Sequence, residues 1–156
     1  MHNKQPQATG LSMLEVIGRD NMTRFKRMIA LDTLGPDVLR LALCAISFTH
    51  GFHRVVHADV SILGQILHDE GLPFGPIAAW LICIAETIGA ACMAFRLLVL
   101  PVSLVLFTIY FTGIMMFHRH NGFFVVGASQ GGWEYNALLC VCLLVVAWEN
   151  RAHSLY

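Results

Sequence analysis

One glutamate, Glu86, stands in the middle of a long apolar stretch, and this position makes it the first candidate for chemistry. An ionisable group inside a membrane is costly, and such groups usually face the interior of a helix bundle at a ligand site or proton relay. The neighbouring residues Ala85, Gly89 and Ala90 are small, so a second helix can approach closely. We therefore expect Glu86 either to transfer protons or to form a structural hydrogen bond between helices.

Imidazole and guanidinium groups follow a second apolar stretch. His50 and Arg54 are spaced i, i+4, and His53 lies between them, so a helix carries the three on one broad face. Because His50 and Glu86 lie at similar depths in their stretches, we expect His50 to be the partner of Glu86.

Two more polar groups come from other apolar stretches, since His118 ends one and Glu134 opens another. Four stretches thus bring polar side chains toward one half of the predicted bundle, whereas the opposite half shows no comparable cluster. We expect a site between the centre of the membrane and its outer face.

A quinone site is the first interpretation of this set. Quinone chemistry needs hydrogen-bond donors for carbonyl groups, a route for protons and an apolar slot that is reached from lipid. No flavin, iron–sulfur or dinucleotide motif is present, so electrons would come from a partner protein. The expected catalytic residues are Glu86, His50 and His118. The expected cofactor-binding residues are Arg54, Glu134, His53, Tyr110 and Phe124.

Two alternatives stay open on the residues alone. Imidazole and carboxylate groups suit zinc, iron or copper, and His50, Glu86, His118 and Glu134 make a four-ligand metal set. His50 and His118 could instead be the axial ligands of a non-covalently bound haem. The other alternative is a non-catalytic scaffold or assembly subunit, in which the polar cluster locks the bundle.

The composition places these groups in a membrane protein. The chain has 156 residues, of which 56% are hydrophobic and 13% are charged, against about a quarter charged in soluble domains. Its formal net charge is zero, so no basic surface indicates nucleic-acid binding. A bilayer crossing needs about 20 largely apolar residues. The segments that qualify are 36–56, 76–95, 97–117 and 133–148, which predicts an all-α membrane protein with a four-transmembrane-helix bundle.

The basic residues predict the orientation of this bundle. Four crossings put both ends of the chain on one side, and all Lys and Arg residues except Arg54 and Arg119 then fall there. By the positive-inside rule we expect a multi-pass membrane protein with both termini in the cytoplasm.

Two segments outside the crossings also have helical periodicity. Residues 11–31 mix apolar and basic residues, which predicts an amphipathic helix on the cytoplasmic leaflet. Residues 59–70 predict a short helix on the outer surface, followed by a rigid turn at 71–76. We therefore divide the chain into a basic N-terminal extension, residues 1–34, and a transmembrane domain, residues 35–156.

Four short motifs occur in order along the apolar part of the chain: His50-Gly51-Phe52-His53-Arg54, Ala85-Glu86 with Gly89, His118 with Gly122-Phe123-Phe124, and Gly132-Trp133-Glu134-Tyr135-Asn136. Together they resemble the motifs of the four helices in the DoxX family of membrane proteins. The resemblance covers about residues 35–150, and Arg54 stands where many relatives have Lys.

The resemblance implies a four-helix bundle in the bacterial cytoplasmic membrane. The family takes its name from a quinone-linked sulfur-oxidising complex, and relatives are discussed as membrane partners of redox and thiol-stress enzymes. It therefore implies a quinone-linked membrane subunit whose partners are the lipid bilayer and other redox proteins. A homo-oligomer is also open.

Overall fold

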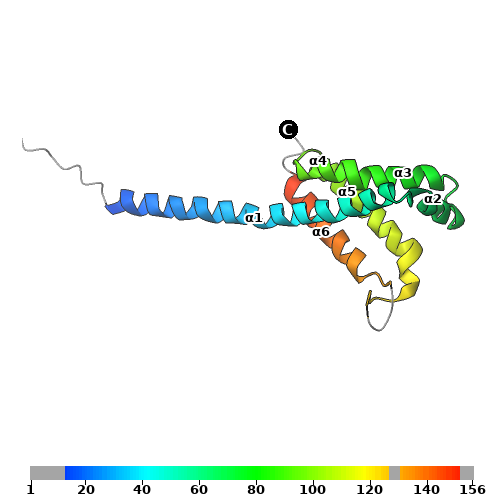
Figure 1. The fold of residues 1–156 in the computed structure, drawn as a ribbon. Coiled ribbons are helices and arrows are strands. Elements are labelled where there is room, and N and C mark those ends of the chain that lie inside the picture. The colour runs from blue at the N-terminus through cyan, green and yellow to red at the C-terminus, as the bar shows by residue number, and fades with distance from the viewer. Residues whose placement is uncertain (1–12, 127–130, 152–156) are drawn as a thin grey trace, which may run out of the picture. The chain divides into compact units, whose positions relative to one another are not determined.

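The computed structural model describes residues 13–126 and 131–151, and every regular element in these ranges is helical. The chain divides into two units, residues 1–35 and 36–156. Helix α1 (Met13–Val56) begins in the first unit, contains Pro36 and ends in the second (Figure 1). The side chains of the predicted amphipathic segment 11–31 lie outside the described part of the structure.

A short helical hairpin follows α1. Helix α2 (Val60–Asp69) confirms the helix predicted at 59–70, and a tight turn joins it to helix α3 (Gly75–Ile84). Glycine allows the close approach of the two helices, because a Cβ atom at Gly64 would lie 2.8 Å from Cα of Pro76. The hairpin buries a small apolar cluster, which consists of Val60, Leu67, Ala79 and Cys83.

Two long apolar helices follow. The first is α3, continued through a π-helical turn, η1 (Ala85–Gly89), into α4 (Ala90–Ala94). The second is α5 (Val99–Gly113), continued through a π-helical turn, η2 (Ile114–His118), and a 3₁₀ turn, η3 (Arg119–Asn121). They run over 20 and 23 residues with mean hydropathies of 1.9 and 2.0, so each is long and apolar enough to cross a membrane. They confirm the helices predicted at 76–95 and 97–117.

The turn between these helices is tight, and the predicted segments 76–95 and 97–117 indeed leave only Arg96 between them. Arg96 (φ 61°) and Leu98 (φ 54°) both adopt left-handed backbone conformations, which reverse the chain within a few residues. Helix α6 (Glu134–Asn150) packs along α5 and occupies the segment predicted at 133–148. The main core joins α1, α4, α5 and α6, and includes Leu43, Cys44, Met93, Leu106, Leu143 and Val146.

The outer surface of the second unit is apolar. Only 28% of the most apolar stretch of each long helix is buried, so neither is the enclosed core helix of a soluble protein. Large apolar side chains are exposed on α1, α3, α5 and α6, as Phe52, Trp80, Leu104 and Leu138 show. Apolar surface of this extent fits contact with lipid. The second unit is thus the all-helical body of a membrane protein.

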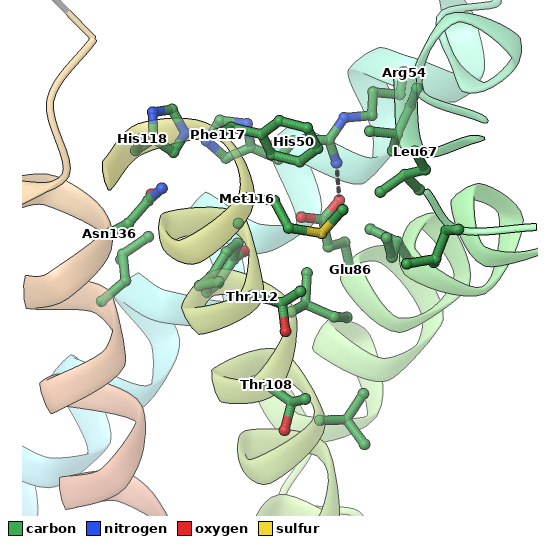
Figure 2. A pocket seen from close by; sticks show the side chains of 18 of the residues that line it. His50, Arg54, Leu67, Glu86, Thr108, Thr112, Met116, Phe117, His118 and Asn136 are labelled. Carbon is green, nitrogen blue, oxygen red and sulfur yellow. Dashed lines mark hydrogen bonds and ion pairs between the residues drawn. The ribbon is translucent and has the colours of Figure 1, made fainter. Parts of the chain in front are cut away.

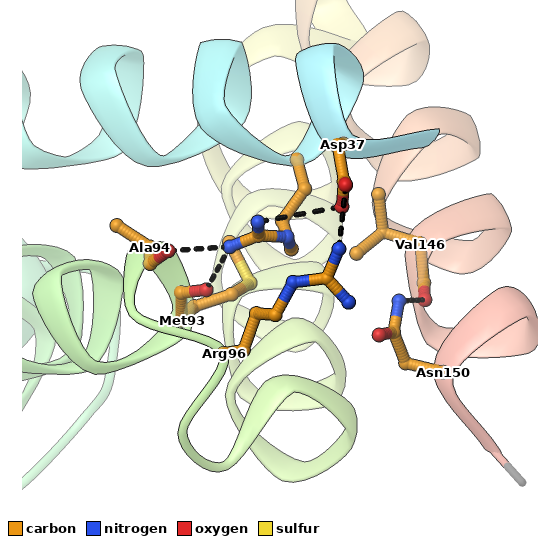
Figure 3. Close-up of polar contacts among 7 residues, drawn as sticks. Asp37, Met93, Ala94, Arg96, Val146 and Asn150 are labelled. Atoms are coloured by element: carbon orange, nitrogen blue, oxygen red, sulfur yellow. Dashed lines mark hydrogen bonds and ion pairs between the residues drawn. The ribbon is translucent and has the colours of Figure 1, made fainter. Parts of the chain in front are cut away.

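An ion-pair network closes one end of the second unit, at the α4–α5 turn (Figure 3). Arg40 is 4% exposed and donates hydrogen bonds of 2.6 Å to the carbonyl oxygens of Met93 and Ala94. Asp37 pairs with Arg40 at 3.4 Å and with Arg96 at 2.5 Å. The expectation that the half of the bundle opposite Glu86 lacks a polar cluster is therefore wrong. The polar cluster at this end has a local cause, because the last carbonyl groups of a helix need hydrogen-bond donors and Arg40 supplies them.

Candidate functional site

The site begins where α1 meets the π-helical turn η1 at close range. Gly51 makes this contact, because a Cβ atom there would lie 2.8 Å from Cβ of Glu86. Ser47, His50 and Arg54 stand three or four residues from one another or from Gly51, so they share the stripe of α1 that faces η1. The close approach thus aims three polar side chains at the region around the buried carboxylate.

Glu86 is buried and ion-paired. It is 1% exposed, and Nη1 of Arg54 donates a hydrogen bond to its Oε2 (Figure 2). From the sequence we expect His50 to be the partner of Glu86, but in the structure the partner is Arg54, one helical turn further along α1. Arginine keeps its charge under ordinary conditions, so it compensates a carboxylate in an apolar interior more reliably than imidazole does.

Two π-helical turns line the same space. Glu86 lies in η1, and η2 carries Met116, Phe117 and His118. A π turn contains one extra residue, which redirects the side chains around it and occurs frequently at functional sites. The sequence did not reveal either turn, because the apolar pattern of a membrane helix does not register one added residue.

A pocket of about 570 Å³ lies beside the ion pair and between these turns (Figure 2). We call it the first pocket. Its polar lining comes from α1, η1, α5, η2 and α6, and consists of His50, Arg54, Glu86, Thr108, Tyr110, Thr112, His118 and Asn136. Apart from Gly113, the other lining residues are apolar, and they include Leu63 and Leu67 of α2. The volume and the mixed lining suit a small organic molecule.

The first pocket is more polar at one end than at the other. His118 stands at the end of η2, whereas Leu104 and Val105 lie about four turns earlier, roughly 20 Å away along the helix axis. Leu104 is 45% and Val105 is 49% exposed, so this end opens onto the apolar outer surface. The arrangement fits an elongated molecule with a polar head and an apolar tail.

A hydrogen bond between helices supports the polar end of the first pocket. The hydroxyl group of Tyr110, on α5, donates to Oγ of Ser47, on α1, at 2.9 Å. Tyr110 is 8% and Ser47 is 1% exposed, so both hydroxyl groups are withdrawn from solvent. Ser47 was not among the predicted site residues. Its only sequence signal is its spacing of three residues before His50, and a serine in an apolar helix often bonds merely to its own backbone.

His118 and Glu134 hold the loop that follows η3. Nδ1 of His118 lies 2.8 Å from the carbonyl oxygen of Gly131, and Oε1 of Glu134 accepts a hydrogen bond of 2.9 Å from the amide of Val125. His118 therefore both lines the first pocket and braces the loop. Glu134 lines neither this pocket nor the second one described below.

Phe124, predicted to bind a cofactor, also lies in this loop. Its ring meets the ring of Phe123 edge to face, with centroids 5.4 Å apart, and its carbonyl oxygen accepts a hydrogen bond of 3.1 Å from the amide of Gly132. It is half exposed and does not line the first pocket.

His53 lines a second pocket, of about 800 Å³, which shares His50 and Arg54 with the first pocket. Asp59 also lines it, and its Oδ2 lies 3.7 Å from Nδ1 of His53. The structure thus divides the predicted residues: the first pocket brings together His50, Arg54, Glu86, Tyr110 and His118, whereas His53 belongs to the second pocket.

The metal interpretation needs several ligands in one place. Among the residues that the structure describes, no group of three or more His, Cys, Asp and Glu side chains could hold a metal ion. The set of His50, Glu86, His118 and Glu134 is therefore not gathered in this conformation. The pairing of His50 and His118 as axial ligands of a haem stays a prediction, which a visible spectrum of the purified protein tests.

These features define an all-helical membrane protein with a pocket of mixed polar and apolar lining between its helices. The DoxX family model matches residues 35–119, which is more than half of the chain and contains His50, Arg54, Glu86 and His118. The chain therefore belongs to the DoxX family, as its motifs predict. No curated protein and no solved structure matches it.

Proposed function

We propose that the chain is the membrane subunit of a redox system and that the first pocket binds a quinone. The observation that carries the proposal is the polarity of this pocket, with the Arg54–Glu86 ion pair near one end and a lipid-facing apolar wall at the other. A quinone has the matching form, because its ring bears carbonyl acceptors and its tail is hydrocarbon. His50 and Arg54 supply donors for those carbonyl groups.

Each residue has a separate task in this proposal. The bound quinone supplies the redox chemistry, since it accepts two electrons and two protons to become a quinol. Glu86 takes up a proton and passes it to the ring, and Arg54 fixes the position of its carboxylate group. Met116 and Phe117 form an apolar wall that excludes water. A membrane-associated redox protein delivers the electrons, because the sequence carries no motif for an electron-transferring cofactor of its own.

The proposed topology has four crossings in the inner membrane, with residues 36–56 of α1 and helix α6 beside the two central helices. Helix α6 has 17 residues, or roughly 26 Å, which is near the lower limit for a crossing. Exposed apolar side chains on both segments support the assignment. A membrane-impermeant thiol reagent tests it. It should label Arg119→Cys but not Glu149→Cys in intact cells, with the unsubstituted protein as background.

Titration with decylubiquinone, followed by difference spectroscopy in nanodiscs, tests the quinone assignment. We expect saturable binding to the wild type and about fivefold weaker binding to His50→Ala, since one lost hydrogen bond costs about 1 kcal/mol. Glu86→Gln should change the difference spectrum. His68→Ala is the matched control, because His68 is exposed on α2 and lines neither pocket. Identical titrations and spectra for all four proteins would contradict the proposal.

A scaffold role is the second candidate, and the ion pair itself favours it. The Arg54–Glu86 pair joins α1 to η1 and would lock the bundle without any ligand. Under this role, Glu86→Gln reduces accumulation of the folded protein, whereas His50→Ala changes neither folding nor ligand binding. The same four proteins therefore distinguish the two candidates.

A further inference from the structure

The two pockets share a wall. Three residues line both of them, namely His50, Arg54 and Leu63, and a side chain that lines two pockets stands between them. Arg54 is engaged with Glu86 on the side of the first pocket (Figure 2). His50 is then the group of this wall whose ring can accept a proton on one nitrogen and release one from the other.

The second pocket contains a further pair of titratable groups. His53 follows His50 by three residues on α1, so the two imidazoles lie on the same side of the helix. The ring of His53 also stacks on the ring of His57, with centroids 4.0 Å apart. The side chain of His53 is 60% exposed and that of Asp59 is 40% exposed, at 3.7 Å from each other. Helix α2 contributes only apolar residues to this pocket, and α6 contributes Tyr135. His53 and Asp59 thus form an exposed titratable pair at this pocket, beside the exposed hydroxyl group of Thr49.

The first pocket needs such a connection. Glu86 is buried, and the end of the pocket near Leu104 and Val105 opens onto the apolar surface, from which no proton can come. Quinone reduction takes up two protons for each pair of electrons, so a pocket of this kind needs a route to water.

We propose that the second pocket is the proton route between water and the first pocket. His53 takes a proton from water while Asp59 stabilises the imidazolium. His50 then receives a proton and passes one across the shared wall to Glu86, from which it reaches a carbonyl oxygen of the quinone. Two such transfers balance the two electrons from the redox partner. This inference rests on the proposed quinone function.

Voltammetry of the full-length protein in nanodiscs, adsorbed on an electrode and loaded with decylubiquinone, tests the route. The electrode replaces the unidentified electron donor, and the scan-rate dependence gives the rate of proton-coupled reduction. We expect His53→Ala to be at least about tenfold slower than the wild type, with unchanged affinity for decylubiquinone. Added imidazole should restore the rate, because it can replace the missing proton carrier but not a missing structural contact.

Two further variants complete the test. Asp59→Asn should be slowed less than His53→Ala, because it removes only the stabilising charge, and His68→Ala should match the wild type. Equal rates for His53→Ala and the wild type would overturn the route, and so would a loss that imidazole does not restore. If the wild type fails to bind decylubiquinone, the quinone proposal falls and the route falls with it.

Discussion

Helix α1 carries two arginines in similar surroundings that do different work. Arg40 and Arg54 both engage a carboxylate in the second unit, and both are largely withdrawn from solvent, with 5% and 29% of their side chains exposed. Arg40 also donates to the carbonyl oxygens of Met93 and Ala94, and it lines neither pocket. Figure 3 shows these two carbonyl groups beside Asp37. Arg54 pairs with Glu86 at the wall of a pocket (Figure 2).

The difference shows what a buried charge needs before it becomes a functional candidate. Arg40 satisfies backbone groups that every helix end leaves open, so its role is complete within the fold. Arg54 and Glu86 satisfy each other but also face a space that a ligand can enter. Burial alone therefore does not distinguish the functional candidate, Arg54, from the structural residue, Arg40. The pocket beside Arg54 does.

The largest expected effect is a loss of stability on substitution of Arg40, in the ion-pair network at the α4–α5 turn. Arg40→Leu removes the donors for two helix carbonyl groups and one partner of Asp37, so we expect a loss of about 3 kcal/mol. Unfolding in a mixed-micelle denaturant series measures it, with the exposed Arg119→Leu as control. The folded fraction should bind decylubiquinone as the wild type does. If Arg40→Leu is as stable as the wild type, Arg40 does not have the structural role that distinguishes it from Arg54.

Gly51→Ala tests the close contact between α1 and η1, which places Arg54 against Glu86 beside the first pocket. The added methyl group would lie 2.8 Å from Cβ of Glu86, so α1 must move away from η1, and we expect a loss of about 1–3 kcal/mol. The same unfolding series measures it. Gly113→Ala is the matched control, because its added Cβ meets no atom within 4 Å beyond its chain neighbours and the backbone of its own helix, and the backbone there is helical. Equal stability of the two variants would contradict the close contact.

Much of the fold could be predicted because membrane helices follow from hydropathy. The two central helices, the tight turn at Arg96 and the short helix α2 all lie close to their predicted positions. The spacing of Ser47, His50, Gly51 and Arg54 also places them on one helix face. This spacing could not predict the partner of Glu86, because two helices in contact can rotate or slide by one turn. The close approach at Gly51 determines which residue of α1 lies next to Glu86.

The two π turns and the role of Arg40 lay beyond the sequence for a related reason. A π turn changes where His118 and Glu86 point without changing the apolar composition around them. Arg40 looks like a basic residue at the start of a crossing, and only the fold brings the end of α4 to it. Both are consequences of tertiary packing, which local pattern does not record.

Glu134 extends the comparison to a residue that was predicted to bind a cofactor. Its carboxylate accepts the amide hydrogen of Val125 and lines neither pocket, so it should behave like Arg40 rather than like Arg54. Glu134→Gln keeps an acceptor oxygen but loses its charge, and we expect a small loss of about 1 kcal/mol in the unfolding series. Affinity for decylubiquinone should not change. A tenfold loss of affinity at wild-type stability would instead return Glu134 to the ligand site and place the loop next to the ligand.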